Sequence, residues 1–241
     1  MAWKITLFVL MSLVIIAGIT FPIVPHPVNW YEFPIIPGLE EKAKIIFFHV
    51  PTAWLSVVAF LMAMVYGIKY LRNHNLDDDA KSAASLQLGM VFCILATVTG
   101  SIWAKFNWGT FWSWDPRETS IFILLLIYGS LFALRSAVEN EDKRARLSAV
   151  YSIIAFLTVP FFIFIMPRIM LGLHPGSLEI DPNTNKIVSG SNPVVDFKMN
   201  ISMRLVFFVS LFAFTILYGW MWKLRSRAII IKENLTKNKL R

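Results

Sequence analysis

The sequence predicts an all-α integral membrane protein with six transmembrane helices and both termini in the cytoplasm. Of its 241 residues, 56% are hydrophobic and 16% are charged, a composition typical of membrane proteins and not of soluble ones. Six apolar runs contain no acidic or basic residue, and most reach the roughly 20 residues that a helix needs to cross the hydrocarbon core. Lysine and arginine gather in alternate loops, which gives the orientation.

The first run, residues 5–24, follows Lys4 and resembles the start of a secretory signal. No small-residue cleavage site follows it, because the next residues are Pro25, His26 and Pro27, so we expect a retained first helix. The remaining runs predict helices over residues 45–68, 82–104, 119–134, 147–167 and 205–222. The run 119–134 is slightly short and should extend through its flanks. Together the six helices form a single membrane domain, residues 1–241.

The orientation follows from the distribution of positive charge. The N-terminus, the loops 69–81 and 135–146 and the tail 223–241 hold 15 of the 23 lysines and arginines, so we place them in the cytoplasm. The net charge of +8 is mostly this bias and the basic cytoplasmic tail. It indicates contact with anionic lipid and gives no reason to expect nucleic acid.

Three outer loops remain, residues 25–44, 105–118 and 168–204. The third contains the turn-rich segment 181–185 between short apolar segments at 178–180 and 187–188. This pattern predicts a small hairpin or a folded cap on the outer surface. The chain has no phosphate-binding loop motif, so we do not expect it to hydrolyse nucleotides by itself.

The second outer loop holds an unusual density of tryptophan. Residues 108–120 read Trp-Gly-Thr-Phe-Trp-Ser-Trp-Asp-Pro-Arg-Glu-Thr-Ser. Aromatic faces beside fixed charges suit a flat, apolar ligand with an ionic edge, such as haem with its two propionates. The candidate ligand-binding side chains are Trp108, Phe111, Trp112, Trp114, Asp115 and Arg117. Arg117 can pair with a propionate through two hydrogen bonds, and Lys105 is a second candidate.

Two structural interpretations compete with a ligand site. Tryptophans gather at membrane interfaces as anchors, and Trp30, Trp220 and Trp222 fit that role. Asp115, Pro116 and Glu118 also form a helix-start signature of N-cap, first helical position and N3. Neither accounts for the density of aromatic residues, so we expect a loop folded into an aromatic platform.

Two of the four histidines stand out as iron ligands. His49 opens the second predicted helix and His174 follows the fifth, so both should lie near the outer surface with the tryptophans. His74 lies in an inner loop and His26 in a stiff turn between prolines. Two neutral imidazoles on opposite faces of a haem would make a six-coordinate, low-spin iron. The single cysteine, Cys93, excludes an internal disulfide and a Cys-x-x-Cys-His attachment site, so the haem would be held non-covalently.

The tryptophan-rich segment resembles the signature of the haem-handling proteins of cytochrome c maturation, the CcmC-type haem exporter components and the larger cytochrome c synthetases. In that group two histidines in the outer loops that flank the motif are the axial ligands. His49 matches the first by its motif, His-Val-Pro-Thr-Ala-Trp, and His174 matches the second by its order. The length, the six helices and a single flanking histidine pair resemble the CcmC type. Phe111 stands where the CcmC pattern usually has tryptophan.

The resemblance implies a function, a location and partners. The protein would hold haem b at the periplasmic face of the bacterial inner membrane and deliver it to a periplasmic haem chaperone. A small single-helix subunit and ATP-binding-cassette (ABC) transporter subunits would be further partners. It would act in haem transport and not as an enzyme, so no catalytic residue is expected.

Three alternatives stay open. A haem lyase or synthetase subunit acting on apocytochrome would co-purify with apocytochrome and not with a chaperone. A b-type cytochrome that passes electrons needs stacked intramembrane histidine pairs, which the helices lack. A permease for haem would show intramembrane charges or broken helices, and the sequence shows neither.

Overall fold

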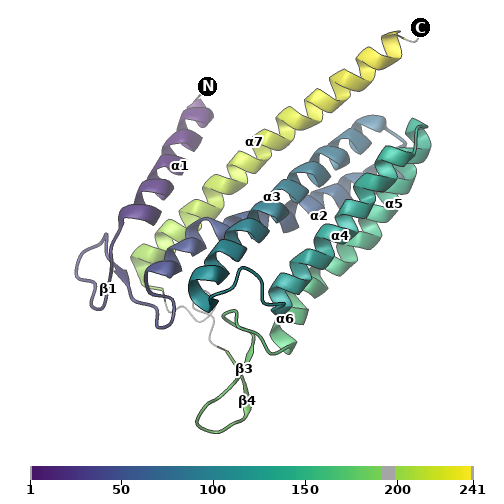
Figure 1. Ribbon diagram of the computed structural model, residues 1–241. Helices are drawn as coiled ribbons and strands as arrows, with labels where there is room; N and C mark the ends of the chain where they lie inside the picture. The colour runs from purple at the N-terminus through teal and green to yellow at the C-terminus, as the bar shows by residue number, and fades with distance from the viewer. Residues whose placement is uncertain (1, 191–198, 240–241) are drawn as a thin grey trace.

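The computed structural model describes residues 2–190 and 199–239 and has six helical stretches long and apolar enough to cross a membrane (Figure 1). This confirms the predicted all-α membrane fold with six spanning helices. The stretches are Trp3–Thr20, Glu40–Asn73, Leu76–Trp108, Pro116–Ala137, Glu141–Ile169 and Ile201–Thr236. The first helix begins and the last ends at the same end of the bundle, and the short strands lie at the other end (Figure 1). We call the end with the strands the outer end.

Helix α1 (Ala2–Thr20) ends before residue 24, where the apolar run would have placed its end. Pro22 explains the difference, because proline disfavours helical backbone at the residue before it and cannot donate a backbone hydrogen bond. The chain instead forms strand β1 (Ile23–Val24), which pairs in parallel with β2 (Phe33–Pro34). The first outer loop is therefore folded back against the end of α1.

The second span is broken at Phe48. A 3₁₀ helix, η1 (Glu40–Phe47), precedes α2 (His49–Asn73), and Phe48 between them has φ −123° and ψ −52°. Pro51 is the third residue of α2, and in an uninterrupted helix its ring would clash with the carbonyl of Phe47. The proline therefore sets the start of α2 and places His49 as its first residue.

Helix α3 (Leu76–Trp108) is longer than the predicted run at both ends. Asn75 caps its start by accepting a hydrogen bond from the backbone N–H of Asp77 at 2.9 Å. At the other end Gly109 adopts a left-handed φ of 81°, a common helix terminator. The expectation that residues 105–118 form a loop is corrected here: residues up to Trp108 are helical, and only residues 109–115 connect α3 to α4.

Helix α4 (Pro116–Ala137) begins with the predicted cap, since Asp115 and Glu118 form a capping box around Pro116. Helix α5 (Glu141–Pro160) continues through the π-helical turn η2 (Phe161–Ile165) into α6 (Met166–Ile169). Pro160 and Pro167 flank the turn, and prolines are a usual cause of such irregular segments. The span therefore ends at the outer surface with a wider turn than a regular helix.

Strands β3 (Leu178–Ile180) and β4 (Ile187–Ser189) pair antiparallel and form a hairpin around the turn-rich segment. Residues 191–198 of the third outer loop lie outside the described residues. Helix α7 (Ile201–Lys239) then runs through the predicted membrane span and most of the basic tail as one helix. The tail up to Lys239 is thus helical.

The core of the bundle lies between α2, α3, α4 and α5. The rings of Phe60 and Tyr128 stack there with centroids 3.5 Å apart, and both side chains are buried. At the inner end a two-pronged ion pair joins Arg135 of α4 to Asp79 of α3, at 2.7 and 2.8 Å. This packing fixes α3 and α4 relative to each other, and their outer ends carry the tryptophan-rich segment.

Candidate functional site

The connection from α3 to α4 is held by Glu118. One carboxylate oxygen of Glu118 accepts hydrogen bonds from the backbone N–H of Ser113 at 2.7 Å and of Asp115 at 3.3 Å. The hydroxyl of Ser113 donates to the same oxygen at 3.1 Å. Between them Trp114 has a left-handed φ of 59°, which is uncommon for a bulky residue. The capping box therefore shapes the connection as well as starting α4.

Asp115 links this connection to the third outer loop. Its buried carboxylate accepts hydrogen bonds from the backbone N–H of Arg117 at 2.9 Å and of Leu173 at 2.6 Å, and contacts Nδ1 of His174 at 2.7 Å. Burial alone would raise the pKa of Asp115. The hydrogen bond and charge of His174 and the two backbone donors outweigh burial, so the pKa of Asp115 lies below its usual value. Asp115 is therefore an anionic anchor for the loop.

The close approach of the loop to Asp115 depends on Gly172. A Cβ atom at this position would lie 2.8 Å from Oδ2 of Asp115 and 3.0 Å from Oγ of Ser177. Both distances are too short for a carbon atom in ordinary van der Waals contact. Glycine at position 172 thus allows the backbone of Leu173 to reach the carboxylate.

His174 lies against two tryptophans of α3. Its ring is 4.7 Å from that of Trp108 in an edge-to-face arrangement and 6.1 Å from that of Trp103. The rings of Trp103 and Trp108 are in turn 5.1 Å apart. The indole N–H of Trp103 donates to the carbonyl of Lys42 at 3.0 Å, which ties this cluster to the segment before α2. His174 is thus held by a carboxylate and by aromatic packing.

His49 lies against the same helix, one turn before Trp103. Its Nδ1 is 3.0 Å from the hydroxyl oxygen of Thr99, and Gly100 leaves room for the ring, since a Cβ there would lie 2.9 Å from its Cε1 atom. Both histidines selected from the sequence therefore lie against the outer part of α3, His49 beside Thr99 and His174 beside Trp108.

The other aromatic residues form a separate group. Trp112 and Trp114 make an edge-to-face pair at 5.7 Å, and each is 6.2 Å from Phe122 of α4. Trp114 is 67% exposed and Phe111 is 58% exposed. The predicted platform is thus divided. Trp108 lies beside His174, whereas Trp112 and Trp114 pack on Phe122 of α4, and Trp114 and Phe111 are exposed.

The candidate basic residues lie at the edges of these groups. Arg117 donates one hydrogen bond to the carbonyl of Pro175, the residue after His174, at 3.3 Å. Its guanidinium carries further N–H donors that this bond does not use. Lys105 donates to the carbonyl of Gly109 at 2.7 Å and lies 5.6 Å from the ring of Phe111. Arg117 is therefore the cation nearer to the histidines, and Lys105 belongs to the outward-facing side.

Sequence reasoning selected Asp115 as a haem-binding residue, whereas the structure places it against His174. It did not identify Thr99 or Gly172, which also position the histidines. Thr99 and Gly172 have no distinctive motif of their own. A signal for Gly172 existed in the pattern Leu-Gly-Leu-His-Pro-Gly, because glycine near a candidate ligand indicates a close backbone approach. Of the two histidines set aside, His74 caps α2 at the inner end with a left-handed backbone.

The chain matches one family of known proteins. The family model described as Heme exporter protein C matches residues 38–241. The protein named Heme exporter protein C of Paracoccus denitrificans is 33% identical over 196 residues, which are 79% of this chain and 78% of that protein. Its namesake in Rhodobacter capsulatus is 34% identical over 69% of this chain and 70% of its own length. The one from Escherichia coli K12 is 29% identical over 85% and 78%, respectively.

Proposed function

The chain belongs to the Heme exporter protein C family, and we propose on this premise that it binds haem at the outer end of the bundle and hands it on in cytochrome c maturation. His49 and His174 are the axial ligands of the iron in this proposal. The haem is bound and passed on unchanged, so the protein acts as a haem-handling component and not as an enzyme.

The partners of Nδ1 in the two histidines are the observation that carries this proposal. The Thr99 hydroxyl donates its own hydrogen to the carbonyl of Leu95 at 2.7 Å, so toward His49 it acts as the acceptor of Nδ1–H. Asp115 accepts Nδ1–H of His174 in the same way. In each neutral imidazole the lone pair then lies on Nε2, the atom that binds iron. Metal-ligating histidines are usually oriented by such partners on the other ring nitrogen.

The donor set also fits haem better than a free metal ion. Among residues 2–190 and 199–239, no group of three or more His, Cys, Asp or Glu side chains could hold a metal ion. A haem brings four nitrogen ligands with it and needs only one or two axial ligands from the protein. A pair of histidines is therefore sufficient for haem, but is a poor site for zinc.

The surrounding residues can hold the rest of the ligand. Trp108 packs on His174 and offers an apolar surface beside the iron position. Trp112 and the exposed rings of Phe111 and Trp114 offer a second apolar surface for the macrocycle. The free donors of Arg117 can bind a propionate. Such a surface leaves part of the macrocycle accessible, as transfer to another protein requires. Asp115 orients His174 and does not contact the haem in this arrangement.

The orientation and partners complete the proposal. The inner end of the bundle carries most of the lysine and arginine, so the histidines face the periplasm if the protein lies in the bacterial inner membrane. A periplasmic haem chaperone is the proposed acceptor. The small single-helix subunit and the ABC transporter subunits implied by the resemblance are the proposed partners in the membrane.

An absorption spectrum of the purified protein tests the proposal. We expect the wild type to show a six-coordinate, low-spin haem, and His49→Ala or His174→Ala to give a high-spin spectrum or to lose haem. His26→Ala is the matched control and should leave the spectrum unchanged. A wild type that binds no haem after reconstitution would contradict the proposal, as would a low-spin spectrum that survives in both ligand variants.

A further inference from the structure

Helix α7 is much longer than the membrane is thick. Its 39 residues span about 58 Å at 1.5 Å per residue, against a hydrocarbon core of about 30 Å. Near the inner end the indole N–H of Trp222 donates to the carbonyl of Lys81 at 3.2 Å, which marks the level of the first turns of α3. Helix α7 continues without a break after Trp222, and its C-terminal end lies past the ends of the other helices (Figure 1).

The part of α7 after Trp222 has one face toward the bundle and one face away from it. Ser226 is 5% exposed, and Glu233 lies 3.7 Å from Arg144 of α5, so these two residues face the bundle. Successive residues of an α-helix are rotated by about 100°. On this basis four apolar residues lie within about 40° of the direction opposite to Ser226 and Glu233. This outer seam consists of Leu224, Ala228, Ile231 and Leu235. Leu224 is 53% exposed, and Ile231 and Leu235 are each 58% exposed.

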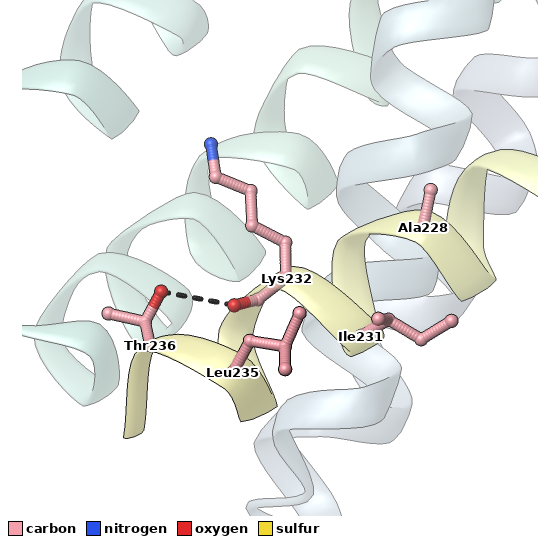
Figure 2. Close-up of a pocket in the computed structure, with 5 residues that line it drawn as sticks. All are labelled: Ala228, Ile231, Lys232, Leu235 and Thr236. Atoms are coloured by element: carbon pink, nitrogen blue, oxygen red, sulfur yellow. Dashed lines mark hydrogen bonds between the residues drawn. The ribbon is translucent and has the colours of Figure 1, made fainter. Parts of the chain in front are cut away.

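The seam has the spacing of a helix-pairing surface. Its residues follow one another by four, three and four positions, which is the a/d repeat of a coiled coil. A hollow of about 540 Å³ lies along it, lined by Ala228, Ile231, Lys232, Leu235 and Thr236 (Figure 2). The small Ala228 lets a neighbouring backbone approach between larger residues. The surface is therefore shaped to receive the ridge of another helix.

Positive charge borders the seam on both sides. Arg227 lies on one flank and Lys232 on the other, the places that e and g residues take in a coiled coil. Arg225 lies on the same side as Lys232 and donates a hydrogen bond to Gln87 of α3. Residues 223–239 contain six lysines and arginines and one acidic residue, Glu233, which is turned toward Arg144. A partner with matching charge must present carboxylates at its own flanks.

We propose that the outer seam docks an acidic amphipathic helix of a partner protein at the inner, cytoplasmic end of the bundle. A second copy of this chain would place its own arginines and lysines against these flanks. Anionic headgroups can contact the basic flanks, but the hydrocarbon core is a poor occupant of the seam. Helix α7 continues without a break, so Ile231 lies about 13 Å along its axis beyond Trp222. The proposal rests on α7 alone and does not depend on haem binding.

Binding of a designed helix to the full chain tests the proposal. The probe is a fluorescent 21-residue peptide with leucine at a and d and glutamate at e and g, and the control peptide has lysine in place of glutamate. Both are titrated by fluorescence anisotropy onto the protein in phosphatidylcholine nanodiscs. We expect the acidic peptide to bind at least tenfold more tightly than the basic one, and Ile231→Asp to weaken its binding at least tenfold.

Asn234→Asp is the matched control, because it adds the same charge at an exposed position outside the seam. It should change binding less than twofold. In the double variant Arg227→Glu and Lys232→Glu, the basic peptide should bind more tightly than the acidic one. Equal binding of both peptides, or equal effects of the two aspartate variants, would overturn the proposal.

Two further outcomes would assign the seam to another occupant and so overturn the proposal. In mass photometry, a dimer of the protein that Ile231→Asp abolishes would identify a second copy. Loss of acidic-peptide binding in nanodiscs that contain phosphatidylglycerol, with blue-shifted emission from a fluorophore at position 231, would identify the membrane.

Discussion

Asp115 joins two roles in one side chain. It starts α4 as its N-cap, and it holds His174 and the loop before it. The helix-start interpretation of this part of the motif is confirmed. In the proposed site the same carboxylate would position His174 and would not contact haem directly.

The variant Asp115→Asn separates these roles. The asparagine oxygen can keep the cap and the bond to His174, so we expect α4 to be preserved. Its NH2 group would face the backbone N–H of Leu173, so the melting temperature should fall modestly. The neutral amide makes His174 a less basic ligand, so bound haem should have a higher midpoint potential in a potentiometric titration. Asp115→Ala removes cap and partner together, and should weaken haem binding by about 10–100-fold. An unchanged potential in Asp115→Asn would show that the carboxylate does not tune His174.

A substitution at Gly172 tests the close approach of the third outer loop to Asp115. In Gly172→Ala the added methyl would lie 2.8 Å from Oδ2 of Asp115, so the loop must move away. We expect a loss of stability of about 1–3 kcal/mol and weaker haem binding, measured by thermal denaturation and haem titration. Gly129→Ala in α4 is the control, because a Cβ there meets no atom within 4 Å. Similar behaviour of the two variants would refute the assigned role.

At the scale of the helices, the sequence predicts which segments cross the membrane more reliably than where each helix begins and ends. The apolar runs identify all six spans, because hydrophobic length is set by the bilayer. The ends depend on short-range backbone chemistry that an apolar run does not reveal. Pro22 stops α1, Pro51 restarts α2, and Gly109 ends α3 beyond the predicted point.

The sequence predicted which residues lie along the outer part of α3, but not which residues position them. Histidine and tryptophan are rare enough for their positions to be informative, and His49 contacts α3 at Thr99 while His174 packs on Trp108. Their role as haem ligands stays a prediction. Thr99 and Gly172 act through distances between segments far apart in the chain, which a single sequence does not contain. Tryptophan density also gave no means of telling that Trp112 and Trp114 pack on α4 instead of beside His174.

The ion pair between Asp79 and Arg135 joins the inner ends of α3 and α4, and its contribution to stability can be measured. In Arg135→Met the buried carboxylate of Asp79 loses its partner, which should destabilise the protein by about 3–5 kcal/mol. The double variant Asp79→Leu and Arg135→Met removes both charges and should recover most of this loss. Thermal denaturation in detergent measures both effects, and a single variant as stable as the wild type would contradict the prediction.

For the whole molecule, the proposed orientation makes opposite ends accessible from opposite sides. In a Cys93→Ala background, a cysteine at Asn183 in the turn after β3 should react with a membrane-impermeant maleimide in intact cells from which the outer membrane has been removed. A cysteine at Asn234 on α7 should react only after lysis. The reverse pattern would place the histidines in the cytoplasm and exclude a periplasmic acceptor.

The two histidines differ in what holds them in place. His49 belongs to a long span that starts at a proline-defined break, whereas His174 belongs to a loop fastened by one carboxylate and one tryptophan cluster. In the proposed haem site, one ligand would therefore belong to a membrane span and the other to a surface loop. A partner that lifts residues 171–175 from the aqueous side would then release the haem, and no membrane helix would have to move.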